Sequence, residues 1–148
     1  MNIAKENSEE AYCIRVEPFM IESLWSRCLP FLENPEIGDI EYCSMQEIKH
    51  DCLNQSSQLW ILMKGDELVG CFLTNIGVAS DSVNIVNIFN LSGTSIESWI
   101  GELDRKIVEF CQQNNCKFYS YVGRPGFKKF VPQLTSPGVF YLREVPNV

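Results

Sequence analysis

The side chains that could perform acid–base or metal chemistry are few and scattered. His50 is the only histidine, and it lies beside Asp51 in a polar stretch with helical periodicity, where a single histidine is usually a surface residue. No motif places a serine or cysteine to pair with it as a nucleophile. The seven cysteines contain no Cys-x-x-Cys pair and no other metal-ligand spacing, so the sequence predicts neither a metal site nor a thioredoxin-type redox site.

The net charge limits the class of partner. With 12 basic and 19 acidic residues the chain carries −7, which repels phosphate backbones and disfavours a general nucleic-acid binder. The one basic cluster is Arg124, Lys128 and Lys129. The cysteines lie among apolar neighbours, which indicates reduced thiols, and the first ten residues contain no apolar signal segment. We therefore expect a cytoplasmic protein that does not enter a membrane.

The elements that must position these side chains follow from the apolar periodicity. Residues 1–11 read as a flexible tail and residues 12–148 as a single domain. The predicted order is β, α, α, β, β, β, α, β, α, β, over residues 12–17, 18–29, 45–53, 58–64, 67–76, 82–91, 94–113, 117–122, 127–134 and 139–145. Since parallel strands need a crossover helix, the strands on either side of the third long helix are predicted to be parallel.

Local signals fix several boundaries. Ser44 with Glu47 and Thr94 with Glu97 have the spacing of capping boxes at helix starts. Gly65-Asp66 predicts a tight turn between two strands, and Pro30 predicts a break or bend in the first helix.

This order resembles that of the GNAT acyltransferases over nearly the whole chain after residue 11. LWILMKGDELVGCFLTNI (residues 59–76) is similar to the hairpin of that family. YVGRPGFKKFVPQL (residues 121–134) is similar to the GRPGW stretch of small GNAT-like proteins encoded in tailed-phage genomes. The resemblance implies an α/β fold: a mixed sheet of about six strands, an antiparallel meander followed by β-α-β-α-β, with helices on both faces.

The resemblance also implies acetyl-CoA as cosubstrate, held between the fourth and fifth strands. Its pyrophosphate would lie at the start of the following helix, here Leu91, Ser92, Gly93, Thr94 and Ser95, with Arg124 as a further contact. The family pattern has an arginine or glutamine and two small residues in this loop, whereas this chain has the single glycine Gly93. An alternative interpretation is that Thr94 and Glu97 only cap the helix.

Amine acetylation needs a base for the ammonium and an acid for the thiolate. The family commonly uses a glutamate on the central strands and a tyrosine in the last helix. Here the strand over residues 82–91 carries Asn84, Asn87 and Asn90 but no acid, and the last predicted helix carries no tyrosine. The remaining catalytic candidates are Tyr121, Tyr141 and Glu41, with Tyr119 and Asp39 as alternatives.

Two functions stay open at this point. The first is an acetyl-CoA-dependent N-acetyltransferase whose acceptor amine is unknown. The second is a non-catalytic GNAT-like protein of a phage virion, or one that binds a host protein. In either case the edge strands of the meander could pair in a homodimer.

Overall fold

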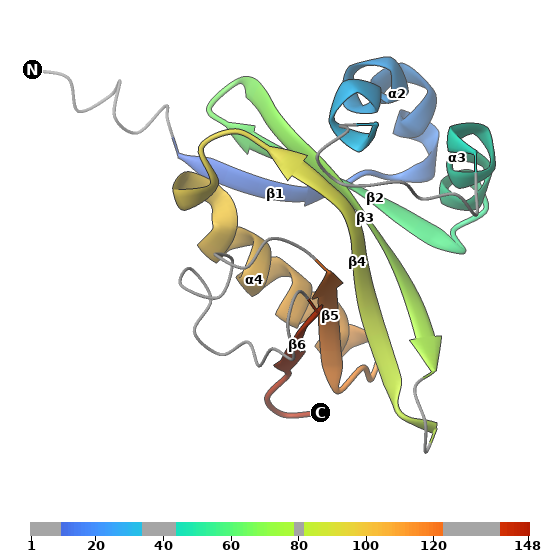
Figure 1. The fold of residues 1–148 in the computed structure, drawn as a ribbon, viewed down its shortest axis with the longest axis vertical. Helices are drawn as coiled ribbons and strands as arrows, with labels where there is room; N and C mark the ends of the chain where they lie inside the picture. Colours follow the sequence, from blue (N-terminus) through green and yellow to red (C-terminus); the bar gives the residue numbers. More distant parts are fainter. Residues whose placement is uncertain (1–9, 34–43, 79–81, 123–139) are drawn as a thin grey trace, which may run out of the picture.

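Nine elements make up the part of the chain that the computed structural model describes, which is residues 10–33, 44–78, 82–122 and 140–148 (Figure 1). In chain order they are β1 (Ala11–Arg15), α2 (Pro18–Leu32), α3 (Met45–Leu53), β2 (Ser57–Lys64), β3 (Glu67–Val78), β4 (Asn84–Gly93), α4 (Ile96–Gln113), β5 (Phe118–Val122) and β6 (Phe140–Glu144). This is the predicted order, apart from the helix predicted over residues 127–134, which lies outside the described residues. Strand β1 begins at Ala11, the last residue of the predicted tail.

The described strands form one six-stranded sheet in the order β1-β2-β3-β4-β5-β6. Strands β4 and β5 run parallel, and every other neighbouring pair is antiparallel. Helix α4 makes the crossover between β4 and β5 that a parallel pair requires. The turn between β2 and β3 holds Gly65 at φ 59°, a left-handed conformation that favours glycine. The predicted mixed sheet with an antiparallel meander is therefore confirmed.

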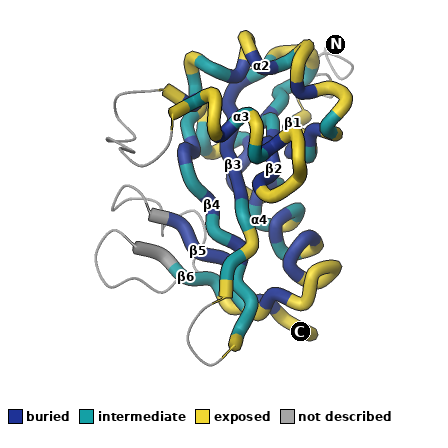
Figure 2. Tube along the Cα trace, turned by 90° about the vertical axis from the view of Figure 1, so that its right-hand side faces the viewer, coloured by how far each residue is buried: buried dark blue, intermediate teal, exposed yellow. Residues whose placement is uncertain are grey.

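Helices cover both faces of the sheet, as predicted. Helix α4 packs on one face and contacts β1, while α2 and α3 pack on the other (Figure 1). Each face has its own apolar cluster, and buried residues run along β2 and β3 between them (Figure 2). We call these clusters the α4-side core and the α2/α3-side core. The first includes Trp60, Phe72, Val86, Ile88, Trp99, Leu103, Ile107 and Phe110, and the second includes Ile21, Trp25, Cys28, Leu59, Cys71 and Leu73.

Aromatic contacts join α4 to the middle of the sheet. Trp60 stacks on Phe72 of the neighbouring strand, with ring centroids 5.6 Å apart, and meets Phe110 of α4 edge to face at 5.3 Å. Phe110 belongs to the three- and four-residue spacing that predicts α4 from the sequence. These contacts fix the position of α4 beneath β1 and β2.

Two local predictions fare differently. The Ser44 hydroxyl oxygen accepts a hydrogen bond from the Glu47 N–H at 3.1 Å, which confirms Ser44 as the N-cap of α3. Pro30, however, does not end α2, which continues to Leu32. A proline weakens a helix because it lacks an N–H donor. Here Leu32 is almost fully buried in the α2/α3-side core, and this burial holds the last turn in place.

The six cysteines that the structure describes are all free thiols. Within the same residues, no helix combines the length and the apolar character that crossing a membrane requires.

Candidate functional site

The two parallel strands separate partway along β4. They pair from Ile85 with Phe118 to Ile88 with Tyr121. Strand β5 then ends at Val122, whereas β4 continues to Gly93 (Figure 1). Beyond Ile88 the β5-facing edge of β4 therefore faces no strand within the described ranges. An extended ligand can occupy such an edge in place of a strand.

A β-bulge lies in this part of β4, where the strand still pairs with β3. Leu73 faces Phe89, but Cys71 faces Ser92, so three steps along β4 match two steps along β3. Asn90 adopts φ 53°, a left-handed conformation that asparagine tolerates better than most residues. The extra residue shifts the alternation of side chains, and Ile88 and Leu91 consequently both lie in the α4-side core although they are three residues apart.

The bulge directs the Asn90 side chain to the end of α2. Its Nδ2 donates a hydrogen bond to the Leu32 carbonyl oxygen at 2.9 Å. Asn90 is only 5% exposed, and its Oδ1 has no hydrogen-bond partner within the described residues. Leaving a buried acceptor unpaired costs about 1–3 kcal/mol, so a donor from a bound molecule or a water would be stabilising here. Sequence reasoning missed this residue; the available signal was an asparagine among β-branched strand residues, which is typical of a bulge.

The turn from β4 into α4 is fixed by hydrogen bonds from Thr94 and Trp99. The Thr94 N–H donates to the Val69 carbonyl oxygen at 2.8 Å, and Trp99 Nε1 donates to the Thr94 carbonyl oxygen at 2.7 Å. Ser95 is the N-cap residue, and it has φ 57° and ψ 49°.

The predicted capping box of Thr94 and Glu97 is therefore wrong. The N-cap is one residue later, and no side chain caps the helix. Ser95 is in the left-handed conformation, not the extended one from which an N-cap hydroxyl reaches the first turn. As a result, the N–H groups of Ile96 and Glu97 donate to no acceptor within the described residues.

Gly93 is required by the packing of the backbone. A Cβ atom there would lie 2.7 Å from the Val69 carbonyl oxygen and 3.3 Å from Cζ2 of Trp99. The glycine thus lets the end of β4 approach β3 closely. Of the other predicted cofactor-binding residues, Leu91 is buried in the α4-side core and Ser92 is half-buried, while Thr94 and Ser95 are exposed. The predicted group therefore surrounds the exposed start of α4.

The side chain of Tyr119 does not face solvent or an open site. It is fully buried, and its hydroxyl donates to Asp104 Oδ1 of α4 at 2.6 Å. Arg143 Nε donates to the same oxygen at 3.2 Å. Burial, followed by the Asp104 charge, raises the pKa of the Tyr119 hydroxyl, which keeps it neutral. Tyr119 has a structural role that joins α4, β5 and β6.

Tyr121 lies at the last β4–β5 pair, next to the point where the strands separate. It is 8% exposed and belongs to the α4-side core. Tyr141 pairs with Tyr121 across β5 and β6, but its side chain lies outside the description. Both stay predictions as catalytic residues.

The other candidates are not part of the described site. Glu41 and Asp39 lie outside the described residues, as do Arg124, Lys128, Lys129 and the Gly-Arg-Pro-Gly stretch. His50 is exposed in the last turn of α3. Among the described residues, no three His, Cys, Asp or Glu side chains are placed to hold a metal ion.

No family model matches this sequence, and neither does any curated protein. Solved structures do share the fold. An N-acetyltransferase from Staphylococcus aureus Mu50 is 14% identical, with a TM-score of 0.60 over 93% of this chain and 99% of that one. A GNAT family acetyltransferase from Brucella melitensis, in complex with acetyl-CoA, is 10% identical, with a TM-score of 0.61 over 92% and 88%.

An N-acyl amino acid synthase from uncultured soil microbes is also similar, at 10% identity and a TM-score of 0.63 over 93% of this chain and 92% of that one. At such identities the likeness concerns the fold. The strand order, the parallel β4–β5 pair and these matches together show that the chain has the fold of the GNAT acetyltransferases.

Proposed function

We propose that this chain is an acetyl-CoA-dependent N-acetyltransferase. The observation that carries the proposal is the uncapped start of α4, directly after the stretch of β4 that has no β5 partner. The N–H groups of Ile96 and Glu97, together with the helix dipole, favour an anion such as the CoA pyrophosphate. The Brucella neighbour contains acetyl-CoA, which supports the choice of cosubstrate.

The stretch of β4 beyond its last pair with β5 fits the rest of the cosubstrate. Its edge beyond Ile88 can pair with the amide groups of the pantetheine arm, as an extended chain pairs with a strand. The buried Asn90 Oδ1 belongs to the same stretch and accepts no hydrogen bond within the described residues. An amide N–H or an amine of a bound molecule would satisfy it.

Acetyl-CoA supplies the activated acetyl group, so the chain itself has to bind, orient and move protons. We assign Tyr121 as the proton donor because it lies where β4 and β5 separate. Tyr141 is its cross-strand neighbour and the alternative donor, and Glu41 is the proposed base. A Tyr121→Phe variant should lose acetyl transfer and keep its affinity for acetyl-CoA.

The start of α4 can be tested with two substitutions that differ by one charge. Ser95→Asp and Ser95→Asn both tolerate the left-handed conformation, but only the aspartate places a negative charge at the anion site. Two unit charges about 5 Å apart repel by about 0.8 kcal/mol in water, and by about 3 kcal/mol at an effective dielectric constant of about 20. Ser95→Asp should therefore weaken acetyl-CoA binding at least about fourfold relative to Ser95→Asn.

Isothermal titration calorimetry with acetyl-CoA measures this difference, and a thermal-shift assay gives the same comparison. Equal affinities for the two variants would place the pyrophosphate elsewhere. If millimolar acetyl-CoA neither binds the unmodified chain nor raises its melting temperature, the enzyme proposal fails. The exposed Glu97 carboxylate in the first turn of α4, which opposes an anion, would then favour the non-catalytic alternative.

A further inference from the structure

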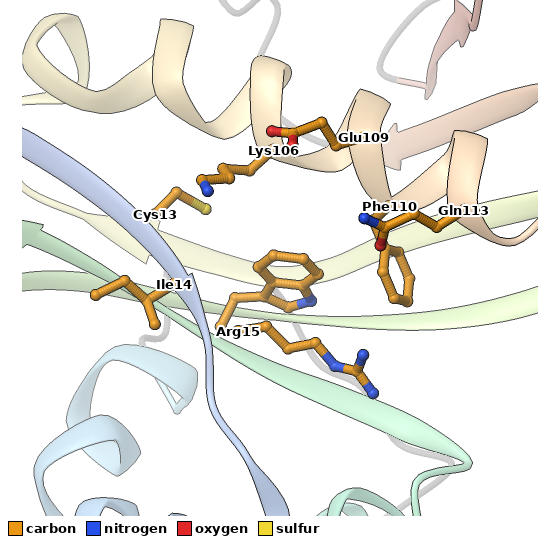
Figure 3. Close-up of a pocket in the computed structure, with 8 residues that line it drawn as sticks. Cys13, Ile14, Arg15, Lys106, Glu109, Phe110 and Gln113 are labelled. Carbon is orange, nitrogen blue, oxygen red and sulfur yellow. The ribbon is translucent and has the colours of Figure 1, made fainter.

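A second concave site lies between the edge strand β1 and the C-terminal half of α4, with a volume of about 230 Å³ (Figure 3). Its lining residues are Cys13, Ile14, Arg15, Trp60, Lys106, Glu109, Phe110 and Gln113. Three of them are consecutive in β1, although successive side chains of a strand point to opposite faces. Figure 3 shows Ile14 pointing away from α4, so the main chain of β1 forms one wall of this pocket.

The main chain of β1 has hydrogen-bonding groups available at that wall. Val16 donates its N–H to Leu59, and Gly65 donates its N–H to the carbonyl oxygen of Glu10. In an antiparallel pair, every second residue directs its main-chain N–H and C=O groups toward the partner strand. Because Glu10 and Val16 do so, Tyr12 and Ile14 between them also direct these groups toward β2. Ala11, Cys13 and Arg15 direct theirs to the outer side, where the sheet has no further described strand.

The floor of the pocket is apolar. Trp60 and Phe110 form most of it, and both are buried in the α4-side core. Cys13 completes it as a neutral thiol, because burial raises its pKa. An apolar or aromatic side chain would replace water above these rings, which is favourable.

The rim carries positive charge that is not neutralised. Arg105 forms ion pairs with both Glu102, at 2.6 Å, and Glu109, at 3.2 Å. No ion pair joins Lys106 or Arg15 to a carboxylate among the described residues, and the Arg15 guanidinium lies over the Phe110 ring at 5.3 Å. Two such cations beside one pocket of a chain with net charge −7 favour an acidic ligand.

We propose that the edge of β1, which has no further strand beside it among the described residues, binds together with this pocket an extended acidic segment of a partner protein. The segment adds as a strand beside β1, hydrogen-bonding to Ala11, Cys13 and Arg15. One apolar side chain lies on the Trp60–Phe110 floor, and a flanking carboxylate meets Arg15 or Lys106. This is recognition by strand addition, in which the main chain gives affinity and the pocket and charges give specificity. It is independent of acetyl-CoA chemistry.

The test uses the labelled peptide Ac-Asp-Val-Phe-Val-Asp-amide, in which the period of a strand places both aspartates and the phenylalanine on one face. The control peptide has lysine in place of both aspartates. Fluorescence anisotropy should show at least about tenfold tighter binding of the acidic peptide. Lys106→Glu should reverse this preference, while the matched variant Lys117→Glu, at an exposed lysine next to β5, should leave it within about twofold.

Strand addition also predicts a dependence on the peptide backbone. Methylating the N–H groups along one edge of the peptide should abolish binding, and methylating those along the other edge should not. Equal binding of both methylated peptides would overturn strand addition, and no binding of the acidic peptide at 1 mM would overturn the site. If sedimentation instead shows a dimer of this chain that Lys106→Glu dissociates, the occupant is a second copy and the proposal of an acidic partner fails.

Discussion

Replacing Tyr119 with phenylalanine removes one buried hydroxyl and leaves the ring volume almost unchanged. The hydroxyl donates to Asp104 Oδ1 at 2.6 Å, a distance typical of a hydrogen bond to a charged acceptor. Such bonds contribute about 1.5–3 kcal/mol to stability. The carboxylate would still accept from Arg143, and its side chain is 18% exposed, so water can partly replace the lost donor. We therefore expect the free energy of unfolding to fall by about 2 kcal/mol.

For a domain of this length, that loss lowers the melting temperature by about 4–8 °C. Urea unfolding of Tyr119→Phe measures the free energy directly, and Tyr12→Phe is the matched control. The Tyr12 hydroxyl meets Glu10 at 3.4 Å on the surface, so its removal should cost less than about 0.5 kcal/mol. A double-mutant cycle with Asp104→Ala, which removes the acceptor, should assign about 1.5–2 kcal/mol to the pair. If Tyr119→Phe costs no more than Tyr12→Phe, the argument that this contact holds α4 to β5 is refuted.

Two further predictions concern stability. Gly93→Ala should destabilise the fold by about 1–3 kcal/mol, because its Cβ would lie 2.7 Å from the Val69 carbonyl oxygen. The control Gly101→Ala in α4 meets nothing within 4 Å and should stabilise the fold by about 0.5–1 kcal/mol. Chemical unfolding measures both variants, and equal effects on stability would contradict the close approach of β3 and β4. Burial raises the pKa of the Cys52 and Cys111 thiols to about 12, so the unfolded chain loses these protons first as the pH rises. The contribution of these two thiols to stability should be constant below about pH 8 and then fall between about pH 9 and 12, by up to about 1.4 kcal/mol per pH unit for each thiol. In urea unfolding at a series of pH values, Cys111→Ala should therefore make the fall of the unfolding free energy with pH shallower over this range.

Much of the fold could be predicted because it depends on local patterns. The spacing of apolar residues marks α4, Gly65-Asp66 marks the β2–β3 turn, and the crossover helix requires β4 and β5 to be parallel. Each of these features is contained in a short stretch of sequence or follows from a general rule of chain topology.

The candidate site could be predicted in position but not in detail. Thr94 and Glu97 have the spacing of a capping box, yet contacts of Thr94 with Val69 and Trp99 move the N-cap to Ser95. Those contacts join residues from β3 and α4, so no local pattern reveals them. The bulge at Asn90 could not be predicted for the same reason, because it depends on the pairing of β4 with β3.

That bulge has a consequence for how the sequence of β4 can change. The side chains of β4 alternate between the two faces of the sheet in two frames, one up to Ile88 and another from Leu91. Asn90 is the extra residue that separates the two frames. Deleting Asn90 would merge the frames into one regular alternation and leave Leu91 in the α4-side core, but it would remove the side chain that bonds to the end of α2. Homologues can therefore lose this single residue without exchanging core for surface along β4, and what they lose is the hydrogen bond that joins β4 to the end of α2.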